Sequence, residues 1–184
     1  MKNYLKVAAI LGIICAVAAV ILAFVNAVTA PRIADYEAKQ TLVALKAVAS
    51  GYDIGERRYD DADSSVNYLI PLTQNGSISG YILELNANGY GGAMTFVASF
   101  NTEGEILAVK MLTNSETPGL GKKSEAAGYM DKFLGTGGRI SIPTSKSELS
   151  AADAQAVSGA SVTFTGIAKA LAYGSDYVKR LGGR

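Results

Sequence analysis

Two short segments contain the residues best suited to chemistry, because each combines small residues with polar ones. The first lies within 115–121. Proline fixes one backbone φ angle and glycine allows close backbone approach, so such a loop can lay its amides against a flat ligand. An ordinary turn between a strand and a helix is the alternative. The residues singled out here are Glu116, Thr117, Pro118, Gly119, Leu120 and Gly121.

The second segment, 158–163, precedes an apolar stretch with helical spacing. The start of a helix presents unpaired amides and a partial positive charge, which together favour a phosphate group. A hydroxyl at that position, flanked by glycine, is accessible to a phosphoryl donor. The alternative is that Ser158 or Ser161 simply caps the helix. The residues singled out here are Ser158, Gly159, Ala160, Ser161, Val162 and Thr163.

The composition excludes several kinds of site. The 184 residues include no histidine and one cysteine, Cys15, which excludes catalytic triads, imidazole metal sites and an internal disulfide. Zinc or iron–sulfur ligation would need more thiolates. The net charge of +1 argues against a nucleic-acid-binding protein. Asp60, Asp61 and Asp63 lack the pattern of a calcium loop. We therefore expect no metal site and no catalytic side chain, and chemistry must use a borrowed cofactor, or hydroxyls, carboxylates and backbone groups.

The N-terminal part of the chain is predicted to be a membrane anchor that precedes these two segments. No charged residue occurs between Lys6 and Arg32, and this run is long enough to cross a membrane. A cleaved signal peptide is the alternative, but Pro31 would follow the cleavage site and the apolar run is too long. The positive-inside rule places the N-terminus in the cytoplasm. We expect residues 1–30 to be a cytoplasmic N-terminus and single transmembrane helix of a cell-membrane protein.

The rest of the chain predicts a linker and one domain. Residues 31–50 are expected to form a linking amphipathic helix, and residues 51–184 an extracytoplasmic domain. Apolar runs separated by Asn-Gly and similar turns indicate an antiparallel sheet, so the fold class is α+β, with flanking helices. Strands are expected at 68–72, 78–85, 94–100 and 106–112, a solvated loop at 51–63, and helices at 124–134 and 162–181.

Taken together, the two segments resemble a known family. This is the FMN-binding domain of the Rnf complex G subunit and of its relative, the C subunit of the sodium-translocating NADH:quinone reductase. Residues 116–121 match the family's ETPGLG element, and residues 89–92 look like its GYGG element. Residues 158–161 align with its flavin-attachment motif SGAT, with Ser161 in place of the threonine. The resemblance covers essentially the whole chain.

The resemblance implies a covalent cofactor. In the family, a flavin transferase moves FMN from FAD onto the motif's hydroxyl as a phosphoester, and here that hydroxyl belongs to Ser161. Residues 158–163 and 116–121 are then expected to bind the cofactor. Tyr90 is expected to stack on the flavin ring, although a packing or surface role is equally open for it. Lys122 or Lys123 is a candidate to stabilise the reduced flavin, with simple solvation as the alternative.

Two features of the attachment segment depart from the family. Ser161 replaces the threonine, and the residue three positions before Ser158 is Gln155, where the family usually has aspartate. The second difference concerns how the transferase recognises the segment. The nearby hydroxyls of Thr163 and Thr165 are the alternative acceptors, but they lie outside the motif.

The resemblance also implies a function. We expect an electron-carrying subunit of a membrane-bound, ion-translocating ferredoxin:NAD oxidoreductase of the Rnf type, with no catalytic activity of its own. Its partners would be the other Rnf subunits, especially the membrane subunits, and transiently the flavin transferase, but no nucleic acid. The alternatives are the equivalent subunit of a sodium-translocating NADH:quinone reductase, a membrane-tethered binding or sensory domain without redox activity, and a stand-alone flavoenzyme.

Overall fold

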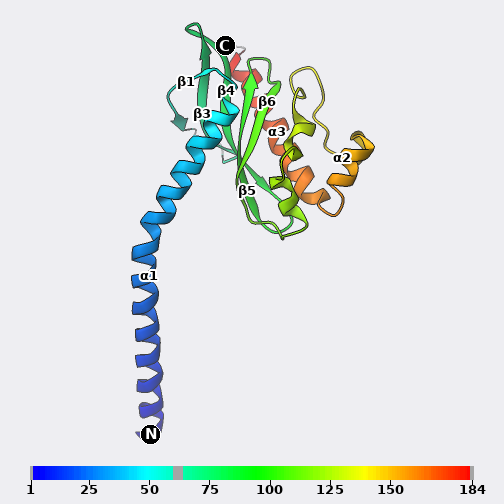
Figure 1. Ribbon diagram of the computed structural model, residues 1–184. Coiled ribbons are helices and arrows are strands. Elements are labelled where there is room, and N and C mark those ends of the chain that lie inside the picture. Colours follow the sequence, from blue (N-terminus) through cyan, green and yellow to red (C-terminus); the bar gives the residue numbers. More distant parts are fainter. Residues whose placement is uncertain (1, 60–63, 183–184) are drawn as a thin grey trace. The chain divides into compact units, whose positions relative to one another are not determined.

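The structure is a computed structural model that describes residues 2–59 and 64–182, so the three aspartates at 60–63 lie outside the described residues. The chain forms two compact units, residues 1–41 and 42–184. Helix α1 (Lys2–Val48) begins in the first unit, and its last residues belong to the second. The sheet and every other helix belong to the second unit (Figure 1).

Helix α1 is apolar over most of its length. Within the described ranges, α1 is the one helix that is long and apolar enough to cross a membrane. The side chains of its most apolar stretch are not buried. The helix expected to follow Pro31 is present, but Pro31 lies inside α1 rather than at a new start. Because proline has no N–H to donate, α1 lacks one backbone hydrogen bond at this position.

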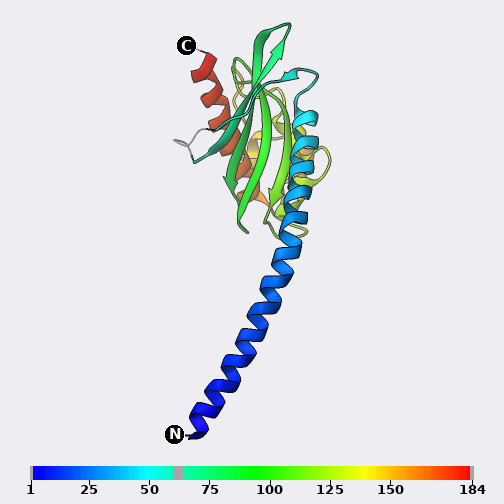
Figure 2. The same ribbon diagram turned by 90° about the vertical axis from the view of Figure 1, so that its left-hand side faces the viewer.

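The second unit is built on a twisted antiparallel sheet, whose long strands lie side by side in Figure 2. The strand order is β1-β3-β4-β5-β6, and β2 also pairs with β3. Each of the four predicted strands is present and longer than expected: β3 (Val66–Gln74), β4 (Ser77–Asn88), β5 (Ala93–Asn101) and β6 (Ile106–Asn114). Asn75 and Gly76 have φ values of 52° and 77°, which is the left-handed turn predicted between β3 and β4.

Part of the predicted loop at 51–63 is extended instead. Two short strands, β1 (Asp53–Ile54) and β2 (Arg58–Tyr59), pair with β3. All four of their residues are exposed, so they show no apolar alternation. The loop prediction was therefore wrong at these two places, because pairing with β3 rather than local sequence makes them strands.

Both faces of the sheet are covered. Helix α3 (Ser161–Gly182) packs on one face through a set of apolar residues that are each at most 1% exposed: Phe164, Ile167, Ala168, Leu171 and Val178. On the other face, Ala44, Leu45 and Val48 of α1 pack within a second cluster that includes residues of β3, β4 and β5. Two-sided burial explains why the middle strands are apolar on both faces.

Two glycines let α3 approach the sheet closely. A side chain at Gly166 would collide with the carbonyl oxygen of Asn88, the last residue of β4. A Cβ at Gly174 would lie 2.9 Å from the ring of Phe100 and 2.9 Å from Leu85 Cδ1. The N-terminal half of α3 is therefore held against the end of β4 through backbone contact.

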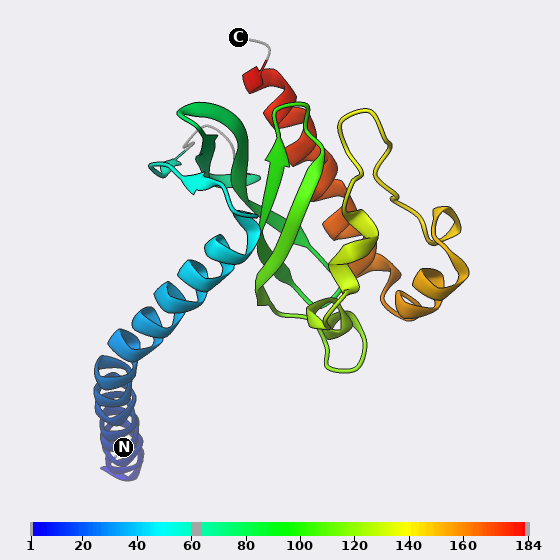
Figure 3. The ribbon, with the colours of Figure 1, turned by 45° about the horizontal axis from the view of Figure 1, so that its top comes forward.

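The helix predicted at 124–134 is wrong. This stretch forms two 3-10 turns, η1 (Gly121–Glu125) and η2 (Tyr129–Phe133). Gly128 between them has a φ of 77°, a left-handed conformation that an α-helix cannot contain. Sequence analysis also missed η3 (Lys146–Glu148) and the short helix α2 (Ala151–Ala156), which Ser150 caps. Figure 3 shows this whole region lying on one side of α3.

Candidate functional site

The two segments singled out in the sequence meet at one cavity of about 470 Å³. We call it the Glu116 cavity. Of the residues named from the sequence, Pro118, Gly119 and Ser158 do not line it, and neither do the two lysines at 122 and 123. The residues that line the Glu116 cavity are Tyr90, Glu116, Thr117, Leu120, Gly121, Gly159, Ala160, Ser161, Val162 and Thr163.

The loop that follows β6 is folded around a tight turn. The N–H of Leu120 donates to the carbonyl of Thr117 at 3.2 Å, which closes a four-residue turn. Pro118 fixes φ at the second position, and Gly119 takes a φ of 79° at the third. A Pro-Gly pair in the centre is typical of a type II turn, which only glycine adopts easily at its third position. This turn gives Leu120 its place on the cavity wall.

Glu116 holds two loops together. Its side chain is only 4% exposed, and Oε1 accepts a hydrogen bond from the N–H of Gly91 at 3.1 Å. A side chain at Gly89 or at Gly121 would collide with the carboxylate. The acid therefore fills the space that these glycines leave open, and it joins loop 89–92 to loop 116–121.

A second set of contacts fixes the same loop from the end of β6. Asn114 Oδ1 accepts from the N–H of Glu116 at 2.8 Å, and Asn114 Nδ2 donates to Ser124 Oγ at 2.9 Å. Ser124 Oγ in turn donates to the carbonyl of Gly121 at 2.8 Å. Sequence analysis missed Asn114 and Ser124, although a polar residue at a strand end beside a turn was a usable signal.

The attachment segment is more open. The carbonyl of Ala160 accepts the first helical bond of α3, from Phe164 N at 3.0 Å, so Ala160 occupies the N-cap position. Alanine has no side-chain acceptor for a helix amide. The N-cap residue of α3 is therefore neither Ser158 nor Ser161, which was the alternative interpretation of this segment. The first amides of α3 therefore have no partner within the helix. Ser161, the first helical residue, is exposed, and its hydroxyl makes no hydrogen bond within the described residues.

The neighbouring hydroxyls differ from that of Ser161. Thr163 is 1% exposed, and Thr165 Oγ1 donates to the carbonyl of Thr144 at 3.2 Å. Gly159 has a φ of 81°, and a Cβ there would lie 3.4 Å from Leu120 Cδ2. Accessibility therefore favours Ser161 among the three hydroxyls, and Leu120 brings the two segments into contact.

Two lysines converge on Ser158. Lys123 Nζ donates to the carbonyl of Ser158 at 3.3 Å, and Lys146 Nζ donates to Ser158 Oγ at 3.4 Å. Lys122 instead lies 3.8 Å from Glu125 Oε1, in an exposed pair. Sequence analysis named Lys123 but missed Lys146, which stands in a region that it assigned no role. Both ammonium groups lie near the open end of α3, where an anion is favoured.

The residues around the Glu116 cavity suit a flat, partly polar ring that carries an anionic group. Tyr90, Leu120 and Val162 are 82%, 48% and 54% exposed, so they offer apolar surface at the cavity. Glu116 Oε2 accepts no hydrogen bond from any described residue. The described residues contain no cluster of three or more His, Cys, Asp or Glu side chains that could hold a metal ion.

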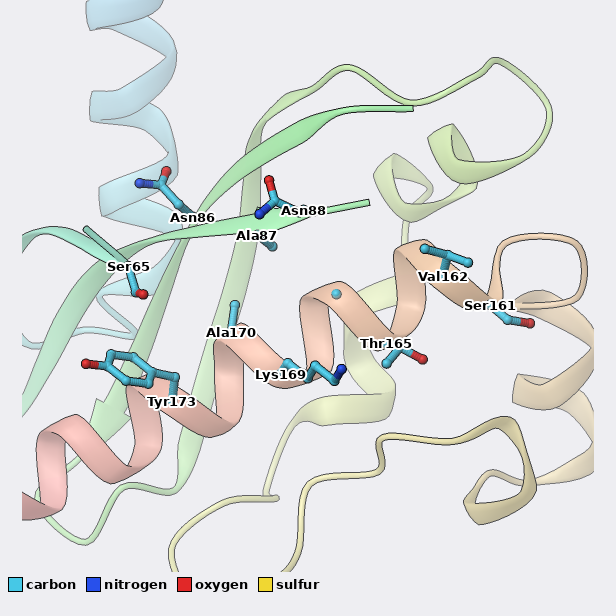
Figure 4. Close-up of a pocket in the computed structure, with 11 residues that line it drawn as sticks. Ser65, Asn86, Ala87, Asn88, Ser161, Val162, Thr165, Lys169, Ala170 and Tyr173 are labelled. Carbon is cyan, nitrogen blue, oxygen red and sulfur yellow. The ribbon is translucent and has the colours of Figure 1, made fainter. Parts of the chain in front are cut away.

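A second cavity, of about 640 Å³, lies between α3 and the end of β4 (Figure 4). We call it the Lys169 cavity. Ser161 and Val162 line it as well as the Glu116 cavity. Nothing in the sequence had indicated it. Its lining residues are Ser65, Asn86, Ala87, Asn88, Ser161, Val162, Thr165, Gly166, Lys169, Ala170 and Tyr173.

Comparison with known proteins gives two family matches. Residues 89–175 match the FMN-binding domain, and residues 1–48 match the RnfG N-terminal region. The G subunit of the ion-translocating oxidoreductase complex of Stutzerimonas stutzeri is 32% identical over 62% of this chain. The match spans about half of that relative, 53% of its length.

Two relatives match over nearly their whole length. The G subunit of the ion-translocating oxidoreductase complex of Methanosarcina acetivorans is 27% identical over 96% of this chain and 95% of its own. The G subunit of the Na(+)-translocating ferredoxin:NAD(+) oxidoreductase complex of Acetobacterium woodii is 26% identical over 88% of this chain and 85% of its own. Both segments that form the Glu116 cavity fall within the FMN-binding match.

Proposed function

Since this chain belongs to the family of Rnf complex G subunits and carries an FMN-binding domain, we propose that it relays electrons through an FMN that is esterified to Ser161. The observation that carries the proposal is the exposed Ser161 hydroxyl at the shared edge of two cavities. The flavin accepts and releases electrons, and the protein supplies its place and its electrostatic surroundings.

The proposed attachment reaction uses the Ser161 hydroxyl. A flavin transferase would bring FAD, and the Ser161 oxygen would attack the phosphorus of its FMN half, so that the Oγ–P bond would form as the bond to the AMP phosphate breaks. AMP would leave, and the hydroxyl proton would pass to solvent or to a base on the transferase. Thr163 is buried and Thr165 is already hydrogen-bonded, which supports Ser161 as the acceptor.

The remaining charge of the phosphoester needs compensation. The open amides at the start of α3 can donate to phosphate oxygens, and the helix end favours negative charge. Lys123 and Lys146, which already reach Ser158, add positive charge on the same side. These groups also favour the approach of the anionic FAD to the attachment residue.

The Glu116 cavity would receive the ring. Leu120 and Tyr90 offer apolar surface to its faces, and Glu116 Oε2 can accept from a ring or ribityl donor. Gly121, which is buried against the Glu116 carboxylate, keeps the cavity wall thin. A loop that is fixed before binding orients a ligand at a lower entropic cost than a mobile loop does.

The anchor and the relatives complete the proposal. Helix α1 would span the cell membrane once, with residues 1–30 forming the cytoplasmic N-terminus and the span, 31–50 the link, and the FMN domain outside the cytoplasm. The complex would exchange electrons between ferredoxin and NAD and move an ion, and its other subunits would pass electrons to and from this flavin. The chain itself would perform no separate catalysis.

Production of the full chain with and without a flavin transferase tests the attachment. We expect yellow-green fluorescence that survives a denaturing gel, and peptide mass spectrometry that finds one FMN adduct on Ser161. The Thr165→Ala variant should keep the adduct and the Ser161→Ala variant should lose it. An adduct on another residue, or unmodified peptide in the presence of an active transferase, contradicts the proposal.

A further inference from the structure

The attachment residue stands at the boundary between two cavities rather than inside one. Ser161 and Val162 contribute to the wall of the Glu116 cavity and to the wall of the Lys169 cavity. A group esterified to Ser161 can therefore turn toward either side of the start of α3 without moving its point of attachment. The Lys169 cavity, at about 640 Å³, has the volume of an ordinary small-molecule site.

The two cavities differ in charge. Among the described residues, Glu116 is the only charged side chain that lines the first cavity, and Lys169 is the only one that lines the second. Lys169 is exposed and forms no ion pair with any described residue. A neutral ring can occupy either cavity, whereas a ring with negative charge is repelled by an ionised acid and attracted by an ammonium group.

The Lys169 cavity also has the right reach. Ser161, Thr165, Lys169 and Tyr173 recur every four residues along α3, so they share one face (Figure 4). Lys169 stands eight residues after Ser161, which is about 12 Å along the helix axis. A ring at the end of a phosphate and ribityl chain would lie beyond the first turn and close to this lysine.

The opposite wall of this cavity comes from the sheet. Asn86, Ala87 and Asn88 line it from the end of β4, with Ala87 directed toward α3 and the two asparagine side chains directed away from it (Figure 4). The amide of Asn86 is held by Asn67 and Ser64, with Asn86 Nδ2 donating to Asn67 Oδ1 at 2.6 Å, whereas the Asn88 side chain has no hydrogen bond to a described residue.

We propose that the Lys169 cavity is a second binding site for the ring of the FMN attached at Ser161, and that it takes the reduced form. This inference rests on the proposed attachment at Ser161. Reduction adds two electrons and one proton to the ring, which leaves one net negative charge. Lys169 stabilises that charge, while Glu116 disfavours it on the other side. The tethered ring thus changes cavity with its redox state and presents itself to different partners.

Chemical labelling of lysines in the full-length, flavinylated protein tests this site directly. An amine-reactive reagent is applied in detergent solution to the air-oxidised protein and to protein reduced with sodium dithionite, and mass spectrometry gives the labelling rate at each lysine. We expect Lys169 to be labelled at least fivefold more slowly in the reduced protein. Lys110, an exposed lysine of β6 outside both cavities, should be labelled equally in both states.

The Ser161→Ala protein controls for the reductant, because it has the same fold and no tethered flavin. Lys169 in this variant should react equally before and after dithionite. Equal reactivity of Lys169 in the oxidised and reduced flavoprotein overturns the second site. The mass of the 158–163 peptide in the same samples reports the attachment separately, so a failed second site and a failed attachment give different results.

The flavin midpoint potential gives a second readout. The Lys169→Gln variant should hold reduced flavin less well, so that the ratio of reduced to oxidised flavin at a fixed potential falls about tenfold. A tenfold change corresponds to about 30 mV for a two-electron couple. The matched Lys110→Gln variant should keep the wild-type potential. A Lys169→Gln potential equal to that of Lys110→Gln overturns the assignment.

Discussion

Loop 116–121 and turn 158–161 lie against one another, yet they are built on opposite principles. The polar groups of the loop are largely satisfied from within the protein, through Gly91, Asn114 and Ser124. The turn leaves its Ser161 hydroxyl and the first amides of α3 open. Glycine-rich segments that look alike in sequence can thus be a rigid support in one case and a reactive surface in the other.

Two glycines of loop 116–121 are required for different reasons. Gly121 is buried, and its missing side chain is replaced by the carboxylate of Glu116. Gly119 has open space around it, and only its φ of 79° requires glycine. Substitutions at these positions therefore separate a packing requirement from a conformational one, and the stability of the full chain in detergent reports both.

The largest loss of stability is expected for Gly121→Ala. A methyl group there collides with Glu116, and either the acid or the loop must move, which we expect to destabilise the domain by about 3 kcal/mol. Thermal unfolding followed by the near-UV circular dichroism of the tyrosines measures the effect. A melting temperature within a degree of the wild type would mean that the loop is not the rigid support described above.

Glu116→Ala should have the next largest effect. It leaves the N–H of Gly91 without its acceptor and opens a space between the two loops, for an expected loss of about 2 kcal/mol. Glu116→Gln keeps an oxygen for Gly91 and serves as the matched control, with a smaller loss in the same unfolding measurement. If the two variants unfold alike, the bond to Gly91 is not what holds the loops together.

Gly119→Ala should cost about 1 kcal/mol, because alanine disfavours a left-handed backbone even where space is free. Chemical denaturation with urea resolves a change of this size. The comparison with Gly121→Ala is the informative part. A larger loss at Gly119 than at Gly121 would reverse the assignment of the conformational and packing roles.

Ser161→Ala should change stability least, by no more than about 0.5 kcal/mol, because the side chain is exposed and unbonded. The same substitution removes the proposed attachment point completely. Unfolding of the unflavinylated wild type and variant, measured side by side, isolates the effect on stability. A marked destabilisation would show that the Ser161 hydroxyl has a structural partner after all.

Much of this fold could be predicted because local signals suffice for it. The apolar runs of β4 and β5, the Asn75-Gly76 turn and the helical spacing of α3 each lie within one segment, and the structure confirms them. The family resemblance rested on residues 116–121 and 158–161, and the family matches confirm it. The structure brings most of those residues to one cavity.

The rest depends on contacts between distant segments. The strand β2 is two exposed residues long and exists because β3 offers it a partner. Lys146 reaches Ser158 from a connection without regular apolar spacing, so no local pattern indicated this contact. The predicted helix over 124–134 failed at Gly128, where a left-handed residue divides it into two turns. The Lys169 cavity combines residues from three separated regions of the chain, so no single segment of the sequence predicted it.

The close backbone contact between Gly166 and Asn88 determines where the start of α3 lies. Gly166 lies little more than one turn from Ser161, so a methyl group at position 166 would push the start of α3 away from β4 and displace the Ser161 hydroxyl. Such damage would leave both signature segments unchanged in sequence. If Ser161 carries the flavin as we propose, a substitution on the face of α3 that packs on β4 should abolish flavin attachment as a substitution of Ser161 does.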